Sequence, residues 1–156
     1  MLFQEWARQV PPLPAPCLRH PPGGGGRYGL FYTAVPRGAA STGDTWLYGL
    51  QQNAQNRSNL AIVNTGETNS SDSQFAIDIF NGDSGQLAGT VPGISVAARG
   101  WRQINAILAQ FSGVTQGYAR VRRTAGTNPF IAYGVVNDGA AAGERSGDGA
   151  FIGSAR

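Results

Sequence analysis

Acidic side chains come closest to forming a reactive or metal-binding group in this sequence. Asp138, Glu144 and Asp148 lie in one glycine-rich stretch, "NDGAAAGERSGDGA", and hard cations such as calcium are bound by several loop oxygens. Their spacing follows no calcium-loop pattern, so a solvated loop is the favoured interpretation. We predict no metal site here.

Other catalytic groups are sparse. Asp44, Asp72 and Asp78 give no indication of facing one another across a cleft, as the two carboxylates of a glycosidase do. The single cysteine, Cys17, and the single histidine, His20, lie in a proline-rich stretch, which removes Ser-His-Asp and Cys-His chemistry from the remainder. We expect no catalytic residue, no cofactor and no enzyme activity.

Aromatic side chains offer a binding chemistry instead. Trp46, Tyr48, Trp101, Tyr118 and Tyr133 could form a platform on which sugar rings stack, as in carbohydrate-binding modules. The favoured alternative is that most of them are core or sheet-face residues, since aromatic residues are enriched in strands. Trp101 is the strongest candidate for exposure, because it follows a turn glycine.

Three arginines stand beside an apolar run in "GYARVRRTAGTNPFIAYGVVND", residues 117–138. Strand alternation places Tyr118, Arg120 and Arg122 on one face, and we favour solvent-facing arginines whose stems cover apolar area. A polyanion site is the alternative. If the arginines face solvent, replacing Arg120 and Arg122 together leaves the fold largely intact. The candidate ligand-binding residues are therefore Trp101, Tyr118, Arg120 and Arg122.

Apolar runs recur at the spacing of an antiparallel β-sandwich, each bounded by turn-forming residues. They cover residues 27–35, 45–50, 57–64, 73–81, 86–98, 117–124, 129–137 and 150–153. We predict an all-β, immunoglobulin-like sandwich of seven or eight strands.

Two local features accompany these strands. Phe75, Ile77 and Ile79 alternate onto one face, and the following "NGDSG", residues 81–85, predicts a hairpin with a tight primed turn. This turn also explains Asn81, Asp83 and Ser84 without a metal.

The stretch "WRQINAILAQF", residues 101–111, has apolar residues at offsets of three and four. This spacing predicts one short helix near 104–110, with Asn105 as its cap and a strand ending near residue 103.

Composition sets the domain organisation. Residues 1–26 hold most of the nine prolines and the run "GGGG", which predicts a disordered leader or linker, and residues 27–156 make one sandwich domain. The net charge of +3 is too sparsely distributed for a nucleic-acid partner. No apolar run is long enough for membrane insertion, and the N-terminus lacks the apolar segment of a signal peptide.

Four segments, "GLQQNAQNRSNLAIVNTG", "GWRQINAIL", "GYARVRRTAGTNPFIAYGVVNDGA" and "SGDGAFI", together resemble a β-sandwich repeat module of bacterial secreted and surface proteins. The resemblance covers about residues 27–153 and implies an immunoglobulin-like spacer role without shared catalytic residues. The layout of "VNTG" and "VAARGWRQIN" is also similar to the sandwich of the sensory rhodopsin transducer family.

These observations lead to one expected function with two alternatives. We expect a non-catalytic structural or adhesive module of a bacterial extracellular or cell-surface protein, which meets protein neighbours or its own copies through edge strands. The first alternative is a carbohydrate-binding module with a polysaccharide partner. The second is an intracellular, cytoplasmic binding protein similar to the transducers.

Overall fold

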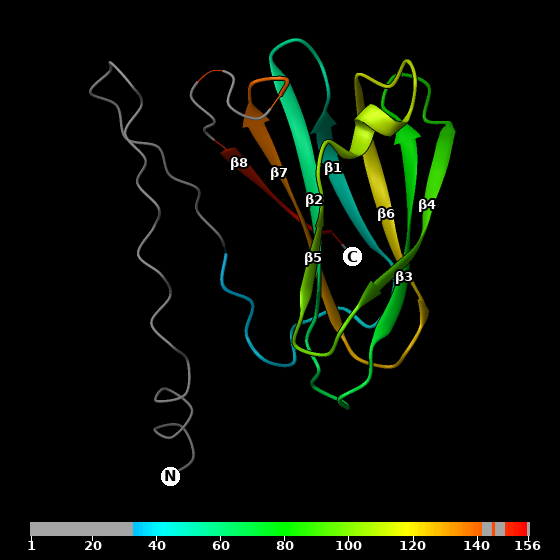
Figure 1. The fold of residues 1–156 in the computed structure, drawn as a ribbon, viewed down its shortest axis with the longest axis vertical. Helices are drawn as coiled ribbons and strands as arrows, with labels where there is room; N and C mark the ends of the chain where they lie inside the picture. Colours follow the sequence, from blue (N-terminus) through cyan, green and yellow to red (C-terminus); the bar gives the residue numbers. More distant parts are fainter. Residues whose placement is uncertain (1–32, 142–144, 146–148, 156) are drawn as a thin grey trace, which may run out of the picture.

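The computed structural model describes residues 33–141, 145 and 149–155. In this part of the chain, two antiparallel sheets of four strands pack face to face (Figure 1), in the orders β1-β6-β3-β4 and β5-β2-β7-β8. The strands are β1 Thr45–Gln51, β2 Asn56–Asn64, β3 Ser73–Asn81, β4 Leu87–Val96, β5 Trp101–Ile104, β6 Gln116–Ala125, β7 Phe130–Asp138 and β8 Gly149–Gly153. The predicted all-β sandwich is confirmed.

Alternation along the strands builds the core between the two sheets. Phe75, Ile77 and Ile79 of β3 are fully buried, as their pattern predicts. Phe130 of β7 comes from the opposite sheet, and its ring centroid lies 5.0 Å from that of Phe75 in an edge-to-face arrangement. The core is thus filled by side chains of both sheets, and the functional surface has to be sought outside it.

The predicted strand at 27–35 is wrong for residues 33–35, which have no regular structure. Pro36 lacks the N–H that a strand ladder requires, and Gly38 adopts a φ of 80°. The chain turns here instead, with Ala39 N–H donating to the Pro36 carbonyl over 3.0 Å. Residues 27–32 lie outside the described residues, as does the predicted leader at 1–26.

The predicted helix near 104–110 is a single 3₁₀ turn, η1, at Ile107–Gln110, whose first two residues are buried. Figure 1 shows it at one end of the sandwich. Asn105 does not cap it: Ala106 holds that position in the left-handed region, at a φ of 46°. The Ala106 N–H donates to Asn59 Oδ1 over 3.0 Å. The apolar spacing is shared between the end of β5 and this turn, so it does not belong to one continuous helix.

The predicted hairpin between β3 and β4 is confirmed, but the prediction of a tight primed turn is wrong. Gly85 N–H donates to the Asn81 carbonyl over 2.8 Å, and Gly85 supplies the left-handed residue, with a φ of 70°. The side-chain oxygen of Asn81 accepts the N–H groups of Asp83 and Ser84. Asn81 therefore organises a longer loop by side-chain capping.

Two edge strands, β1 and β4, carry features that hinder pairing with a further strand. Trp46 of β1 exchanges backbone hydrogen bonds of 2.9 and 2.8 Å with Ala155. In β4, Pro92 precedes a bulge at Gly93, which has a φ of 69°. Proline and bulges at edges hinder edge-to-edge association, so β1 and β4 are poor sites for the predicted strand pairing.

Candidate functional site: the outer face of one sheet

The outer face of the β1-β6-β3-β4 sheet gathers aromatic and charged residues from four strands. We call this surface the aromatic–arginine face; its members are Trp46, Tyr48, Asp78, Phe80, Thr90, Tyr118, Arg120 and Arg122. Direct cross-strand pairing brings them together, since Trp46 and Asp78 both lie opposite Arg120, and Tyr48 and Phe80 both lie opposite Tyr118. Antiparallel partners project from the same side of a sheet, and the intervening residues of these strands fill the core.

Four rings form one compact cluster on this face, in which the Trp46 ring centroid also lies 5.6 Å from that of Phe80 and 6.1 Å from that of Tyr118. The Tyr118 ring centroid lies 5.0 Å from that of Phe80 and 5.5 Å from that of Tyr48. The Trp46 centroid lies 6.3 Å from that of Tyr48. Tyr48, on the edge strand β1, is 55% exposed. Such contacts hold the rings rigidly in place, and Tyr48 offers the largest accessible aromatic surface.

Asp78 is the centre of the polar part of the face. The residue is only 2% exposed, and its carboxylate accepts five hydrogen bonds. Arg120 donates from Nε and Nη2 to Oδ2 over 3.0 and 2.7 Å. Arg122 donates from Nε to Oδ2 over 2.7 Å and from Nη2 to Oδ1 over 3.1 Å. Thr90 donates its hydroxyl to Oδ1 over 2.8 Å.

Arg120 also joins the polar and aromatic parts. Its Cζ lies 5.6 Å from the ring centroid of Trp46, within the range of a cation–π contact. Its Nη1 lies 4.0 Å from Oδ2 of the exposed Asp44. The guanidinium is thus held between a buried carboxylate and an aromatic ring.

The prediction of simply solvent-facing arginines is therefore wrong in part. Arg120 and Arg122 do lie on the outer face with Tyr118, but each arginine side chain is only 34% exposed and both bind Asp78. Burying a carboxylate without its partners is costly, so these arginines stabilise the sheet as well as facing its surface. We therefore predict that replacing both arginines destabilises the fold, in contrast to the outcome expected for arginines that only face solvent.

The same network predicts how stability depends on pH. Hydrogen bonds from Arg122 hold the pKa of Asp78 well below its usual range, despite burial. A carboxyl whose pKa is lowered by folding stabilises the protein above its unfolded pKa of about 3.9, and this contribution is lost as the pH falls further. We expect the free energy of unfolding to fall more steeply below about pH 4 in the wild type than in Asp78→Asn.

Urea unfolding at a series of acidic pH values measures this difference. Asp72→Asn is the matched control, because Asp72 is exposed, and it should keep the wild-type slope. Parallel curves for Asp78→Asn and the wild type would contradict the assignment.

The five-residue aromatic platform is divided between the two sheets. Trp101 begins β5 in the other sheet, where it is 61% exposed, as expected, and lies opposite Val63. Tyr133 of β7 stacks on Phe151 of β8, with centroids 5.7 Å apart. Of the predicted ligand-binding residues, the structure brings together Tyr118, Arg120 and Arg122 and separates Trp101.

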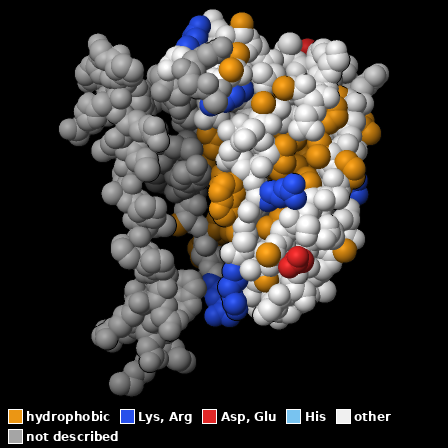
Figure 2. Space-filling model, viewed as in Figure 1, with side chains coloured by type: hydrophobic (Ala, Val, Ile, Leu, Met, Phe, Trp, Pro, Cys, Tyr) orange, Lys and Arg blue, Asp and Glu red, His pale blue; other side chains and the backbone are white. Residues whose placement is uncertain are grey.

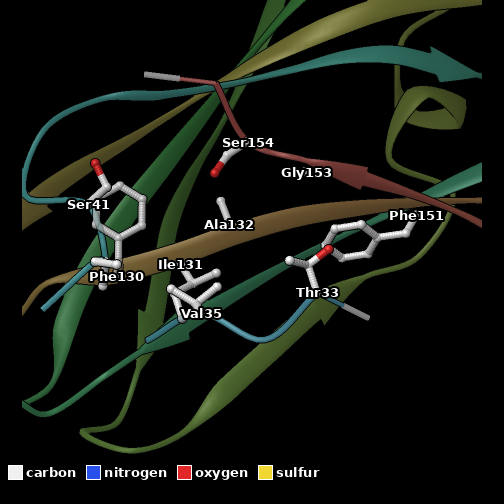
Figure 3. Close-up of a pocket in the computed structure, with 11 residues that line it drawn as sticks. Thr33, Val35, Ser41, Phe130, Ile131, Ala132, Phe151, Gly153 and Ser154 are labelled. Atoms are coloured by element: carbon white, nitrogen blue, oxygen red, sulfur yellow. The ribbon is translucent and has the colours of Figure 1, made fainter. Parts of the chain in front are cut away.

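A shallow pocket of about 240 Å³ lies at the other sheet, β5-β2-β7-β8. Figure 3 shows its labelled residues converging from the segment before β1, from β7 and from β8. They include Val35, Ile131 and Phe151, and the described residues that line the pocket carry no charge. The polar side chains that line it are the hydroxyls of Thr33, Ser41 and Ser154. Because the pocket has no charged group beside its aromatic rings, the aromatic–arginine face is the better candidate site.

Asp138, the acidic-loop residue that the structure describes, belongs to the other sheet. Asp138 lies at the end of β7, 3.6 Å from Arg145. Glu144 and Asp148 lie outside the described residues, as do Cys17 and His20. Within the described ranges, no group of three or more histidine, cysteine or acidic residues could hold a metal ion. No helix there has the length and apolar character to cross a membrane.

Comparisons with protein-family models, with curated proteins and with solved structures find no match for this chain. The functional assignment therefore depends on the geometry of the aromatic–arginine face.

Proposed function

We propose that the protein is a non-catalytic adhesive module of a bacterial extracellular or cell-surface protein, with an immunoglobulin-like structural role. Its contact surface is the aromatic–arginine face, and its partner is a polysaccharide. The observation that carries the proposal is the cluster of four contiguous rings beside two arginines on one sheet face.

The composition and rigidity of this face support binding. Tyrosine, tryptophan and arginine are the residues enriched at binding hot spots, and tyrosine and tryptophan present large contact areas at a low entropic cost. Cross-strand stacking and the Asp78 network fix the rings and guanidinium groups before a partner arrives. A rigid surface loses little conformational entropy on binding.

Contact through this face is better supported than assembly through sheet edges. The β1 edge is bonded to Ala155, and the β4 edge is interrupted at Pro92. The competing surface is β5, a four-residue edge strand that carries Trp101. Figure 2 shows hydrophobic side chains gathered in the middle of the molecular face where Figure 1 places β5.

A co-sedimentation experiment with insoluble polysaccharides distinguishes the two surfaces. The full chain is mixed with cellulose, xylan and purified bacterial cell walls, and the bound fraction is measured for the wild type, Tyr48→Ala and Trp101→Ala. Because truncating an exposed aromatic anchor removes a hot-spot contact, Tyr48→Ala is expected to weaken retention about tenfold or more.

Trp101→Ala is the matched control, since it removes an aromatic ring of similar exposure from the other sheet. It should bind as the wild type does. Loss of retention in Trp101→Ala alone would assign the contact surface to β5, and no retention on any of the three solids would refute the polysaccharide proposal.

A further inference from the structure

The arginines of the aromatic–arginine face keep hydrogen-bond donors available beyond those that Asp78 uses. Both guanidinium groups turn the same edge, Nε and Nη2, toward the Asp78 carboxylate. Nη1 is therefore directed away from Asp78 in each arginine. The Arg120 Nη1 is 4.0 Å from Asp44, too far for a hydrogen bond, and no described residue accepts a hydrogen bond from the Arg122 Nη1. An incoming acceptor can use these donors.

The cluster holds two positive and two negative charges. Asp78 supplies one negative charge against two guanidinium groups, which stay ionised at all physiological pH values. Asp44 supplies the second, 4.0 Å from the Arg120 Nη1, but it is nearly half exposed, so water and salt screen it. The Nη1 donors are best matched by a charged acceptor, because hydrogen bonds between ionised groups are the stronger ones.

The arginine pair adjoins the aromatic cluster. Arg120 lies over Trp46, and Trp46 neighbours the exposed ring of Tyr48. The exposed ring and the arginine pair thus belong to one continuous surface, which successive sugars of a polysaccharide can follow. A planar carboxylate matches the fork of an arginine, while the apolar face of a pyranose ring packs against an aromatic side chain.

From this geometry we infer that the ligand is an acidic polysaccharide, with carboxylate-bearing sugars of the uronic-acid type. This inference rests on the proposed function and specifies its ligand class. Arg120 and Arg122 bind the carboxylate, and Tyr48 with Trp46 contacts the ring of the same or the adjacent sugar.

Three soluble polymers test the inference: polygalacturonate, its methyl-esterified form and poly-L-glutamate. The first carries sugar rings and carboxylates, the second carries the same rings without charge, and the third carries carboxylates without sugar rings. Affinity electrophoresis of the full chain in gels that contain each polymer gives the dissociation constants. We expect the wild type to bind polygalacturonate about tenfold or more tightly than either of the other two polymers, because each lacks one of the two contacts.

Two variants connect this selectivity to named side chains. Arg122→Lys keeps the positive charge and can still reach Asp78, but it loses the planar fork, so its preference for the acid over the ester should fall about tenfold. Tyr48→Ala should weaken binding to both sugar polymers and leave their ratio unchanged. Circular dichroism and the Tm confirm that each variant is folded.

The outcomes separate this inference from the proposed function. Equal binding of the acid and the ester, both weakened by Tyr48→Ala, would overturn the inference and leave the adhesive role standing. Binding of polyglutamate as tight as that of polygalacturonate would overturn the sugar assignment and indicate an acidic protein partner. Absence of binding to polygalacturonate, together with retention on the neutral solids, would also refute the acidic class.

Discussion

Replacing Arg120 and Arg122 together with alanine is expected to lower the free energy of unfolding by about 1–3 kcal/mol at neutral pH, because hydrogen bonds to a charged group are lost and water replaces them only in part. The double variant leaves the Asp78 carboxylate on the sheet without its four arginine hydrogen bonds. Only the Thr90 hydroxyl remains to bind it. Urea unfolding followed by circular dichroism measures the loss.

Two further variants isolate the cause. Arg102→Ala removes an exposed arginine from β5 and is expected to change stability by less than about 0.5 kcal/mol, as surface substitutions usually do. Adding Asp78→Asn to the double variant removes the unpaired charge and should restore part of the stability. A double variant within about 0.5 kcal/mol of the wild type would show that the arginines face solvent without stabilising the sheet.

The orientation of the aromatic–arginine face could be predicted from sequence, but its composition could not. The period of two in β6 correctly places Tyr118, Arg120 and Arg122 on one side, because alternation is a local property of a strand. The alternation of Phe75, Ile77 and Ile79 onto one face leaves Asp78 on the other face of β3. Its pairing with Arg120 joins residues 42 positions apart, and nothing in local periodicity reports which strands become neighbours.

The same limit explains the misplaced Trp101. Sequence patterns identify strands, but they do not assign each strand to one of two sheets. Trp101 and Trp46 both lie at or next to the start of a strand, yet β5 pairs with β2 and β1 pairs with β6. The exposure of Trp101 was predictable from its position after a turn, whereas its separation from Tyr118 depends on the long-range order of the strands.

Local capping chemistry was the other source of error. In the β3–β4 hairpin, the Asn-Gly pair predicts a primed turn, but Asn81 instead accepts backbone N–H groups with its side chain and leaves the left-handed position to Gly85. Both outcomes use the same residue types. The distinction depends on the register of the two strands, which their bulges shift.

Buried asparagines are a structural feature that sequence analysis missed altogether. Asn64 ends the strand predicted at 57–64 and Asn128 lies between two other predicted strands, and yet both are almost fully buried. Asn64 donates from Nδ2 to the carbonyls of Ser71 and Val96 over 3.2 and 3.0 Å. Only their burial, a tertiary property, distinguishes them from exposed turn residues.

Asn128 is expected to stabilise the loop that joins β2 to β3 more than any other single polar side chain does. Its Oδ1 accepts the N–H groups of Thr68 and Asn69 over 3.0 and 2.9 Å. Its Nδ2 donates to the carbonyls of Asn69 and Ser71 over 3.1 and 3.0 Å. Alanine supplies none of these contacts, and a buried group without a partner costs about 1–3 kcal/mol. Asn128→Ala is therefore expected to lower the free energy of unfolding by about 2–4 kcal/mol, because more than one group is affected.

Asn53→Ala is the matched control, since the Asn53 side chain also accepts two backbone N–H groups, from Gln55 and Asn56, but in an exposed turn. Water can replace the lost acceptor there, so the expected cost is below about 1 kcal/mol. Chemical unfolding of both variants at the same pH gives the comparison. Equal losses in the two variants would show that burial adds nothing to the Asn128 contacts, and that the loop is held by backbone conformation instead. A large difference would establish this buried asparagine as the residue that fixes the loop connecting the two sheets.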